Sequence, residues 1–351
     1  MFESFGFETV TAPQAAVWFG VVLGLLFGAL AEVSRFCLRR ALVGPAEERR
    51  GAAGVWLAAL ATAVLGTQAA VAAGLVSFED HRLLAGDLPV AAIMAGGLMF
   101  GAGMVLTRGC ASRMTVLLGT GNLRALSVLL VFAVTAHATL KGVLAPVRTT
   151  LGEWTLPLGE AASLAALPGG GVVWASLIGL GALAVALRSG SSWGGLAAGV
   201  AIGLLVPAGW VGTGFVLYDD FDPIALQSLS FTAPHADTLF WGIASTSIPA
   251  SFGVGLVGGT IGGAFVAALL GQRLRWQSFA SPAETGRYLT GGALMGVGGV
   301  LAGGCTVGAG LAGIPTLSVA AALALFAIAL GALVTSRLLQ QGPSGLAVAA
   351  E

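Results

Sequence analysis

The sequence contains very little charge. Only 9% of its 351 residues are Asp, Glu, Lys or Arg, whereas 56% are hydrophobic, and a soluble globular domain has roughly 25% charged residues. A water-soluble fold cannot hide that much apolar surface. Because the formal net charge is zero, composition gives no case for nucleic-acid binding or for a strongly basic membrane-surface role. The shortage of charge predicts an integral membrane protein.

Reactive and metal-binding side chains are also scarce. The chain has three cysteines and three histidines, without a Cys-x-x-Cys pair, which argues against a disulfide framework or a zinc site. No His/Asp/Glu cluster has metal-ligand spacing and no phosphate loop is present, so we expect no cofactor and no ATP-driven pumping by this chain alone. We expect His81 and His235 in external loops without a specific role, and His137 and Lys141 as helix-end anchors.

Long apolar runs and 55 glycines dominate what is present. Runs of about 20 apolar residues are long enough to cross a bilayer. The spanning segments that we predict are 14–36, 52–76, 90–107, 123–145, 172–188, 193–215, 238–271, 288–303 and 315–338, with 238–271 divided into two shorter helices at Pro249. Small residues let helices approach closely in lipid, and we expect Gly97, Gly101, Gly258 and Gly262 to act in this way. The fold class predicted is an all-α, polytopic helical bundle.

The few charges are distributed asymmetrically between the loops. Arginines gather in 39–51 and 272–287, whereas acidic residues gather in 79–87, 153–160 and 219–237. Because basic loops stay in the cytoplasm, we expect the arginine-rich loops inside and the acidic loops outside. The N-terminus carries Glu3 and Glu8 rather than a basic region, so we expect no signal peptide and a first hydrophobic segment that is retained.

An internal repeat organises the chain. Gly97, Gly101, Gly103, Val105, Leu106, Gly109 and Cys110 recur 195 positions later as Gly292, Gly296, Gly298, Val300, Leu301, Gly304 and Cys305. A weaker match pairs Arg35-Phe36-Cys37 with Ser230-Phe231-Thr232. With the loop assignment above, 90–107 and 288–303 cross in opposite directions, so we predict inverted repeats, approximately 14–145 and 193–338, linked by 146–192 in a single integral membrane transport domain.

Each Gly-Cys pair ends one apolar helix and precedes a short, glycine-rich piece, 111–120 or 306–315, that is too short to span. Non-helical backbone at membrane depth is tolerated only where it lines a cavity or is buried in protein, and free amides at a helix N-terminus form an anion site. We therefore expect short broken helices that meet at a central Gly-Cys constriction. Cys110 and Cys305 should lie close together there, near the centre of the membrane.

The cysteines are the candidate chemical groups. A free cysteine commonly behaves as a small buried hydrophobe, but two of the three occupy equivalent repeat positions. A thiol is a weak donor and a polarisable group, which suits a soft, sulfur-bearing ligand better than phosphate. Arg108 and Arg113 flank Cys110, and these charges are either functional at membrane depth or extended to the cytoplasmic interface.

These motifs together resemble a known family. Phe36-Cys37, the segment from Gly101 to Arg113, Gly121-Asn-Leu-Arg124, the segment from Ser230 to Pro234 and the segment from Gly303 to Leu311 resemble the YeeE/YedE family of bacterial inner-membrane sulfur transporters. The resemblance covers about Val17 to Arg337. It implies an hourglass-shaped helical protein that takes up thiosulfate, with cysteines at the constriction contacting the substrate sulfur in turn. One departure is Arg108, where the family pattern has glycine.

The resemblance and the repeat together give a candidate site. The residues that we predict there are Cys37, Cys110, Cys305, Gly109, Gly304, Thr306, Arg113 and Thr232. A thiosulfate transporter is the main hypothesis; a transporter of a selenium compound, a membrane enzyme with thiol redox or persulfide chemistry, and a structural subunit are the alternatives. An enzyme would need a base or an activating charge beside its thiol. The resemblance also implies a separate, cytoplasmic TusA-like sulfurtransferase as a partner.

Overall fold

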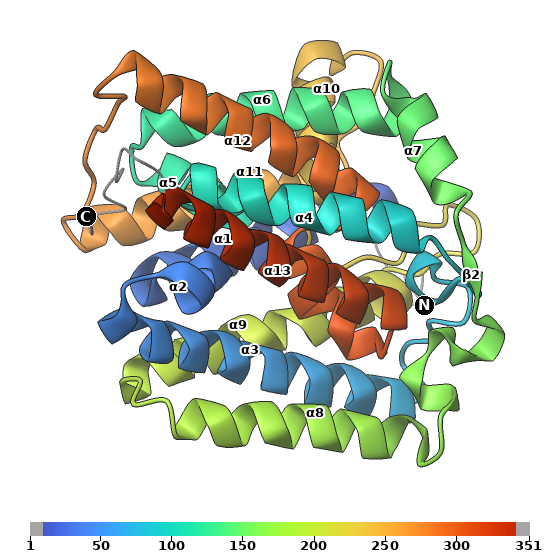
Figure 1. Cartoon of the computed structure of the whole chain (residues 1–351). Helices are drawn as coiled ribbons and strands as arrows, with labels where there is room; N and C mark the ends of the chain where they lie inside the picture. Colours follow the sequence, from blue (N-terminus) through green and yellow to red (C-terminus); the bar gives the residue numbers. More distant parts are fainter. Residues whose placement is uncertain (1–9, 342–351) are drawn as a thin grey trace.

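The computed structural model describes residues 10–341, a bundle of helices with almost no strand (Figure 1). Glu3 and Glu8 lie outside the described residues. The long helices are α1 (Ala12–Ser34), α3 (Ala46–Ala72), α4 (Val90–Leu106), α6 (Leu123–Lys141), α8 (Gly170–Leu187), α9 (Trp193–Val211), α11 (Phe252–Leu270), α12 (Pro282–Leu301) and α13 (Val319–Gln341). Shorter helices are α2 (Leu38–Val43), α5 (Ala111–Gly119), α7 (Ala145–Gly152), α10 (Ala233–Ala244) and the π-helices η5 (Gly212–Val216) and η6 (Thr306–Gly313).

The remaining short elements lie in the connections. Single 3₁₀ turns are η2 (Arg82–Leu84), η3 (Gly159–Ala162), η4 (Leu164–Ala166) and η7 (Ile314–Thr316). The two strands, β1 (Asp87–Leu88) and β2 (Leu156–Pro157), form one antiparallel pair.

The predicted spanning segments are confirmed. Within residues 10–341, nine helical segments are long and apolar enough to cross a membrane, and one falls on each predicted range. The predicted division of 238–271 is also confirmed, because α10 ends at Ala244 and α11 begins at Phe252, on either side of Pro249. The protein is a multi-pass helical membrane protein.

Glycines allow the closest helix contacts, and one of the predicted pairs is wrong. Gly97 and Gly101 of α4 do lie against α13, where a β-carbon would collide with Ala327 and Ile328. Gly258, by contrast, faces open space. The glycines of α11 that contact α1 are Gly255, Gly259 and Gly263. The predicted spacing of four residues between the contacting glycines of α11 is confirmed, but the row begins at Gly255 rather than at Gly258. The sequence alone does not show which of several glycine rows faces the neighbouring helix.

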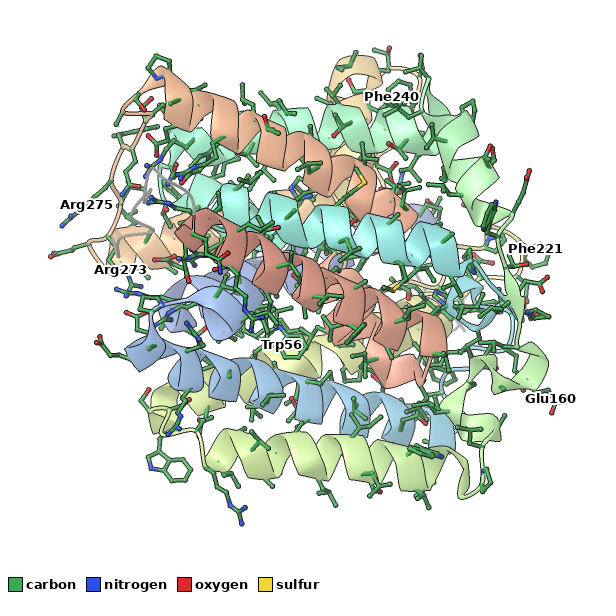
Figure 2. The ribbon with its side chains drawn as sticks, viewed as in Figure 1. Trp56, Glu160, Phe221, Phe240, Arg273 and Arg275 are labelled. Carbon is green, nitrogen blue, oxygen red and sulfur yellow. The ribbon has the colours of Figure 1, made fainter. Side chains whose placement is uncertain are left out.

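The two ends of the bundle differ in charge. Arg273 and Arg275 lie at one end and Glu160 at the other (Figure 2). We call the first the arginine-rich end and the second the acidic end. The loop 272–287 and α2, which begins the segment 39–51, both lie at the arginine-rich end (Figure 1). Arg273 there pairs with Glu32 of α1 at 3.4 Å.

The placement of the arginine-rich end in the cytoplasm stays a prediction that labelling can test. Single cysteines introduced at Arg50 and Glu160, which are both exposed, should react differently with an impermeant maleimide added to intact cells. We expect labelling of Glu160→Cys and none of Arg50→Cys before lysis, because basic loops are retained inside. The three native cysteines are buried and give the background. The opposite labelling pattern would reverse the orientation.

The helices that carry the repeat pack against each other in opposite directions. A β-carbon at Gly96, early in α4, would meet Ala302 at the end of α12, whereas one at Gly103 would meet Met295 and Gly291 earlier in α12. The 195-residue offset also relates element ends: α4 stops at Leu106 and α12 at Leu301. This antiparallel contact is the relation that the predicted inverted repeats require.

Candidate functional site

Four short helices begin at residues that the sequence singled out. Cys37, Cys110, Thr232 and Cys305 are the N-cap residues of α2, α5, α10 and η6. The offset of 195 joins Cys37 with Thr232 and Cys110 with Cys305. The repeat therefore places two pairs of helix starts in equivalent positions, and three of the four carry a thiol.

The structure brings the three thiols together. The Cys37 and Cys110 thiols lie close enough to interact with each other, and the Thr306 hydroxyl lies close enough to interact with Cys110. Cys305 is close enough to Cys110 to interact electrostatically. All three are buried and free of disulfide bonds. Cys110 and Cys305, which are 195 positions apart, thus lie near each other, and Thr306 lies beside Cys110.

Each thiol also faces the first turn of the helix that it caps. The amide of Gly308 donates to the Cys305 sulfur at 3.3 Å. The amides of Arg40 and Arg113, also three residues after their cysteines, face the sulfurs of Cys37 and Cys110 without the geometry of a full hydrogen bond. Since α5 and η6 direct their N-terminal amides toward the thiols, this centre favours a negatively charged ligand.

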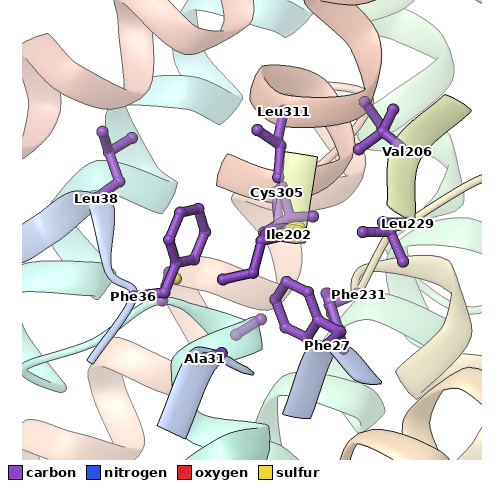
Figure 3. Close-up of a cluster of buried hydrophobic side chains, with 14 of the residues drawn as sticks. Phe27, Ala31, Phe36, Leu38, Ile202, Val206, Leu229, Phe231, Cys305 and Leu311 are labelled. Atoms are coloured by element: carbon purple, nitrogen blue, oxygen red, sulfur yellow. The ribbon is translucent and has the colours of Figure 1, made fainter. Parts of the chain in front are cut away.

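Apolar side chains surround the thiols (Figure 3). Phe36 and Phe231, which are related by the repeat, both contact Phe27 of α1, with ring centroids 6.3 and 5.2 Å apart. Figure 3 shows Cys305 beside Ile202 and Leu311 in the same cluster. A charged group in such apolar surroundings is stable only where donors replace its hydration.

A cavity of about 680 Å³ leads from the acidic end to this centre. Near the acidic end it is lined by Asp80 and Arg82, and its deep end is lined by Thr232, Gly304 and Gly308. Gly304 precedes Cys305 in the sequence, and the Gly308 amide contacts the Cys305 sulfur. We call this cavity, which reaches the residues next to Cys305, the vestibule.

Several donors in this vestibule have no protein partner. Within residues 10–341, the Thr232 hydroxyl and the Trp210 indole nitrogen are buried without a hydrogen bond, and both residues line the cavity. The Arg82 guanidinium donates to the Gly303 carbonyl at 3.1 Å and forms no ion pair within the described part of the chain. Unpaired donors beside a cation are the groups that an oxyanion binds. Arg82 and Trp210 were not predicted from the sequence.

His81 lies beside these groups but adds no charge. Its ring packs edge-on against Trp210, with centroids 5.3 Å apart. Burial, with a smaller effect from Arg82, lowers the pKa of His81 to about 4. The ring is therefore neutral at pH 7. The prediction that His81 lies in a loop is confirmed. Its position in the vestibule wall was not predicted from the sequence.

The expectation for His235 was wrong. This residue lies in α10 rather than in a loop, and it is buried. Its ring contacts the Thr115 hydroxyl of α5 at 3.0 Å and the Phe231 carbonyl at 2.7 Å. Asp237, expected in an external loop, also lies in α10. The acidic and polar residues from 219 onward favoured a loop, but a short helix follows them, and the residues of its first turn are buried. His235 links this helix, α10, to α5.

Arg113 is used differently from the other predicted site residues. Its guanidinium lies 3.7 Å from Glu32 and 3.4 Å from the Ala31 carbonyl, both in α1. Arg273 contacts the same Glu32 carboxylate. Arg113 therefore ties α5 to α1, and only its backbone amide is directed at the thiols. His137 stacks on Phe240, with centroids 4.7 Å apart.

The residue before each Gly-Cys pair has a left-handed backbone. Gly303 has φ +76° and Arg108 has φ +60°. Glycine adopts this conformation freely, whereas a residue with a side chain incurs roughly 1–2 kcal/mol. At Arg108, where the family pattern has glycine, a charged residue thus occupies a strained backbone conformation. On the other side of the constriction, Arg82 reaches Gly303 from a loop.

The match to known proteins agrees with this geometry. Residues 33–334 match the family described as sulphur transport. The chain belongs to the sulphur transport family. Two relatives are named thiosulfate transporter TsuA. The one from Spirochaeta thermophila is 27% identical over 344 residues, covering 90% of this chain and 96% of the relative. The one from Escherichia coli K12 is 27% identical over 321 residues, covering 83% and 86%. The chain spans most of the length of these sulphur transport proteins.

Proposed function

We propose that this protein takes up thiosulfate, or a closely related sulfur-containing anion, across the bacterial inner membrane. The observation that carries the proposal is the vestibule that ends at Thr232 and Gly304, beside three buried thiols. The names of the two relatives support thiosulfate as the ion. The substrate enters from the acidic end and contacts Cys305, Cys110 and Cys37 in turn.

The donor set fits the two ends of thiosulfate. Its three oxygens accept hydrogen bonds from Arg82, Trp210 and Thr232 in the vestibule, as oxyanions do from charged and neutral donors. Its terminal sulfur is large and polarisable, and thiols are the matching soft contacts. Amides at the starts of α5 and η6 add positive potential where water is excluded. Gly304 packs closely on the backbone of η6, Gly109 packs against the Met114 side chain, and Thr306 lies beside Cys110.

A membrane enzyme with persulfide or redox chemistry is the weaker alternative. Such an enzyme would need a base that contacts its thiol. His235 of α10 is buried, but its ring nitrogens are engaged by Thr115 and Phe231. Arg113 is paired with Glu32. Transport by non-covalent contact therefore fits these side chains better than catalysis does. Transport of a selenium compound would use the same soft contacts and is distinguished only by substrate competition.

The wider setting is proposed on the same basis. The repeats, approximately 14–145 and 193–338 with the linker 146–192, form a single transport domain around the constriction. A separate cytoplasmic TusA-like sulfurtransferase would accept the sulfur at the arginine-rich end. That end lies in the cytoplasm if the loop charges follow the positive-inside rule.

Uptake of labelled thiosulfate by proteoliposomes containing the purified full chain tests the proposal. We expect saturable uptake above that of empty vesicles, with competition by unlabelled thiosulfate and weaker competition by sulfate, which has no terminal sulfur. Uptake equal to that of empty vesicles, under imposed gradients of either sign, would reject transport of this ion.

Replacement of Arg82 tests the vestibule. In Arg82→Gln, the KM for thiosulfate should rise by roughly 10-fold or more, because a hydrogen bond to a charged group contributes about 1.5–3 kcal/mol. Arg82→Lys should restore part of the affinity. Arg188→Gln is the control, since Arg188 is exposed and does not line the cavity, and its KM should stay near the wild-type value. Initial uptake rates over a range of thiosulfate concentrations measure both, and equal KM values for Arg82→Gln and the wild type would remove Arg82 from the site.

A further inference from the structure

We infer that the protein has a second anion site at its arginine-rich end, formed by Arg39, Arg108 and Arg287, which receives the transported sulfur oxyanion after it passes the thiols. This inference rests on the proposed function. It concerns residues that lie outside the vestibule and outside the set predicted from the sequence for the constriction.

Three arginines from separate parts of the chain meet at this place. Arg39 follows Cys37 by two residues and is close enough to interact electrostatically with Cys37, Arg108 and Arg287. The Arg287 guanidinium lies over the Tyr288 ring, 5.6 Å from its centroid. α2, the turn before Gly109 and the first turns of α12 thus each contribute a cation to one neighbourhood, which also holds Cys37.

These cations have no counterion of their own. Within residues 10–341, none of the three forms an ion pair or a side-chain hydrogen bond, and the Nε atoms of Arg39 and Arg287 are buried without a partner. Glu284 is close enough to Arg108 to interact with it electrostatically, but its carboxylate is paired with Arg124. Neighbouring arginines differ: Arg124 pairs with Glu284 at 3.0 Å, and Arg113 and Arg273 share Glu32. Like charges repel at short range. A cluster that keeps three unpaired guanidinium groups, where adjacent ones are neutralised, is suited to an anionic ligand.

The backbone at Arg108 strengthens the inference. The equivalent residue of the other repeat is Gly303, and both have positive φ. A glycine would adopt this conformation without strain, so the side chain at 108 is retained at an energetic disadvantage. Across the constriction, the Arg82 guanidinium occupies the neighbourhood of Gly303. Each Gly-Cys pair therefore has a cation nearby. Arg82 lies beside Gly303 and receives the anion from the vestibule, whereas Arg108 itself is the left-handed residue before Gly109 and receives the anion after the thiols.

Arg108→Gly is the decisive variant, because it copies the other repeat and relieves the backbone. In thiosulfate uptake by proteoliposomes, we expect the maximal rate to fall by roughly 10-fold, with the KM measured from the acidic end changed less than about twofold, since the vestibule is intact. Arg39→Gln should give the same division between maximal rate and KM, and Arg108→Lys should retain most of the rate. Arg275→Gln, an exposed arginine at the same end, is the matched control and should behave as the wild type.

Vesicles of phosphatidylcholine alone and of phosphatidylcholine mixed with phosphatidylglycerol separate the possible anions. The same loss in both compositions supports a site for the transported ion. A loss confined to vesicles with phosphatidylglycerol would assign the cluster to a lipid headgroup and overturn the inference. Wild-type rates in Arg108→Gly and Arg39→Gln, or an equal loss in Arg275→Gln, would also overturn it. Absence of uptake by the wild-type protein would instead reject the proposed function.

Discussion

Replacement of Cys110 or Cys305 by serine should reduce thiosulfate uptake by roughly 100-fold, to near the background of empty vesicles. Serine keeps the volume of cysteine nearly unchanged and is a better hydrogen-bond donor, but it is less polarisable. If the constriction only needed a donor to the oxygens of the anion, serine would suffice. Loss of uptake would mean that the thiol contacts the terminal sulfur of thiosulfate.

Alanine variants and Cys37 complete this experiment. Cys110→Ala and Cys305→Ala should also lose uptake while keeping a near-wild-type melting temperature, because a thiol is small and its removal costs little packing. Cys37→Ser should be milder, since Cys37 lies beside Arg39 at the arginine-rich side of the centre. Melting curves of the purified variants distinguish loss of contact from loss of folding. Full uptake by either serine variant at Cys110 or Cys305 would contradict a soft contact there.

Mass spectrometry separates non-covalent contact from persulfide chemistry. Transfer of the terminal sulfur to a thiolate would leave sulfite and add one sulfur atom to the cysteine. We expect no stoichiometric adduct on Cys110 or Cys305 after exposure of the intact protein to thiosulfate. A stoichiometric adduct, with matching release of sulfite, would support the enzyme alternative.

Gly304→Ala should have the second-largest effect. A β-carbon at Gly304 would lie 2.8 Å from the backbone nitrogen of Ala309, within η6. Because backbone cannot move aside as a side chain can, the start of η6 must shift, at a cost of about 1–3 kcal/mol. The shift would displace the Cys305 thiol and the amides that face it. We therefore expect uptake to fall by at least about 10-fold and the melting temperature to drop.

Gly109→Ala is the matched control in the other repeat. There the β-carbon would contact the terminal methyl of Met114 at 2.5 Å, which is the far end of a flexible side chain. The rotamer change should cost about 1 kcal/mol or less, and we expect most of the uptake to remain. Neither glycine has positive φ, so the comparison is one of space alone. Equal uptake by the two variants would show that the packing around Gly304 does not position the site.

Much of the fold was predictable because its determinants are local or periodic. The spanning helices follow from the lengths of the apolar runs. The break near Pro249 follows from the chemistry of proline. The meeting of Cys110 and Cys305 was expected from the repeat, since equivalent positions of inverted halves face each other. The repeat also related Cys37 to Thr232 before any contact was known.

Other parts of the site depend on contacts that no periodicity encodes. Arg82 reaches Gly303 from a loop 221 positions away. Trp210 is one of eight tryptophans in the sequence, and only the cavity makes its nitrogen relevant. His235 was misplaced because its helix is short and follows a run of acidic residues. The sequence left open whether Arg113 acts at membrane depth or extends to the cytoplasmic interface. The ion pair with the buried Glu32 determines where its charge lies.

Thiosulfate uptake by the Cys110→Ser, Cys305→Ser double variant, reconstituted beside the wild-type protein at equal density, tests most directly whether the buried thiols carry the anion through an otherwise apolar constriction. We expect saturable uptake by the wild type and only background uptake by the folded double variant. Uptake by the double variant at the wild-type rate would contradict a role of these thiols in transport.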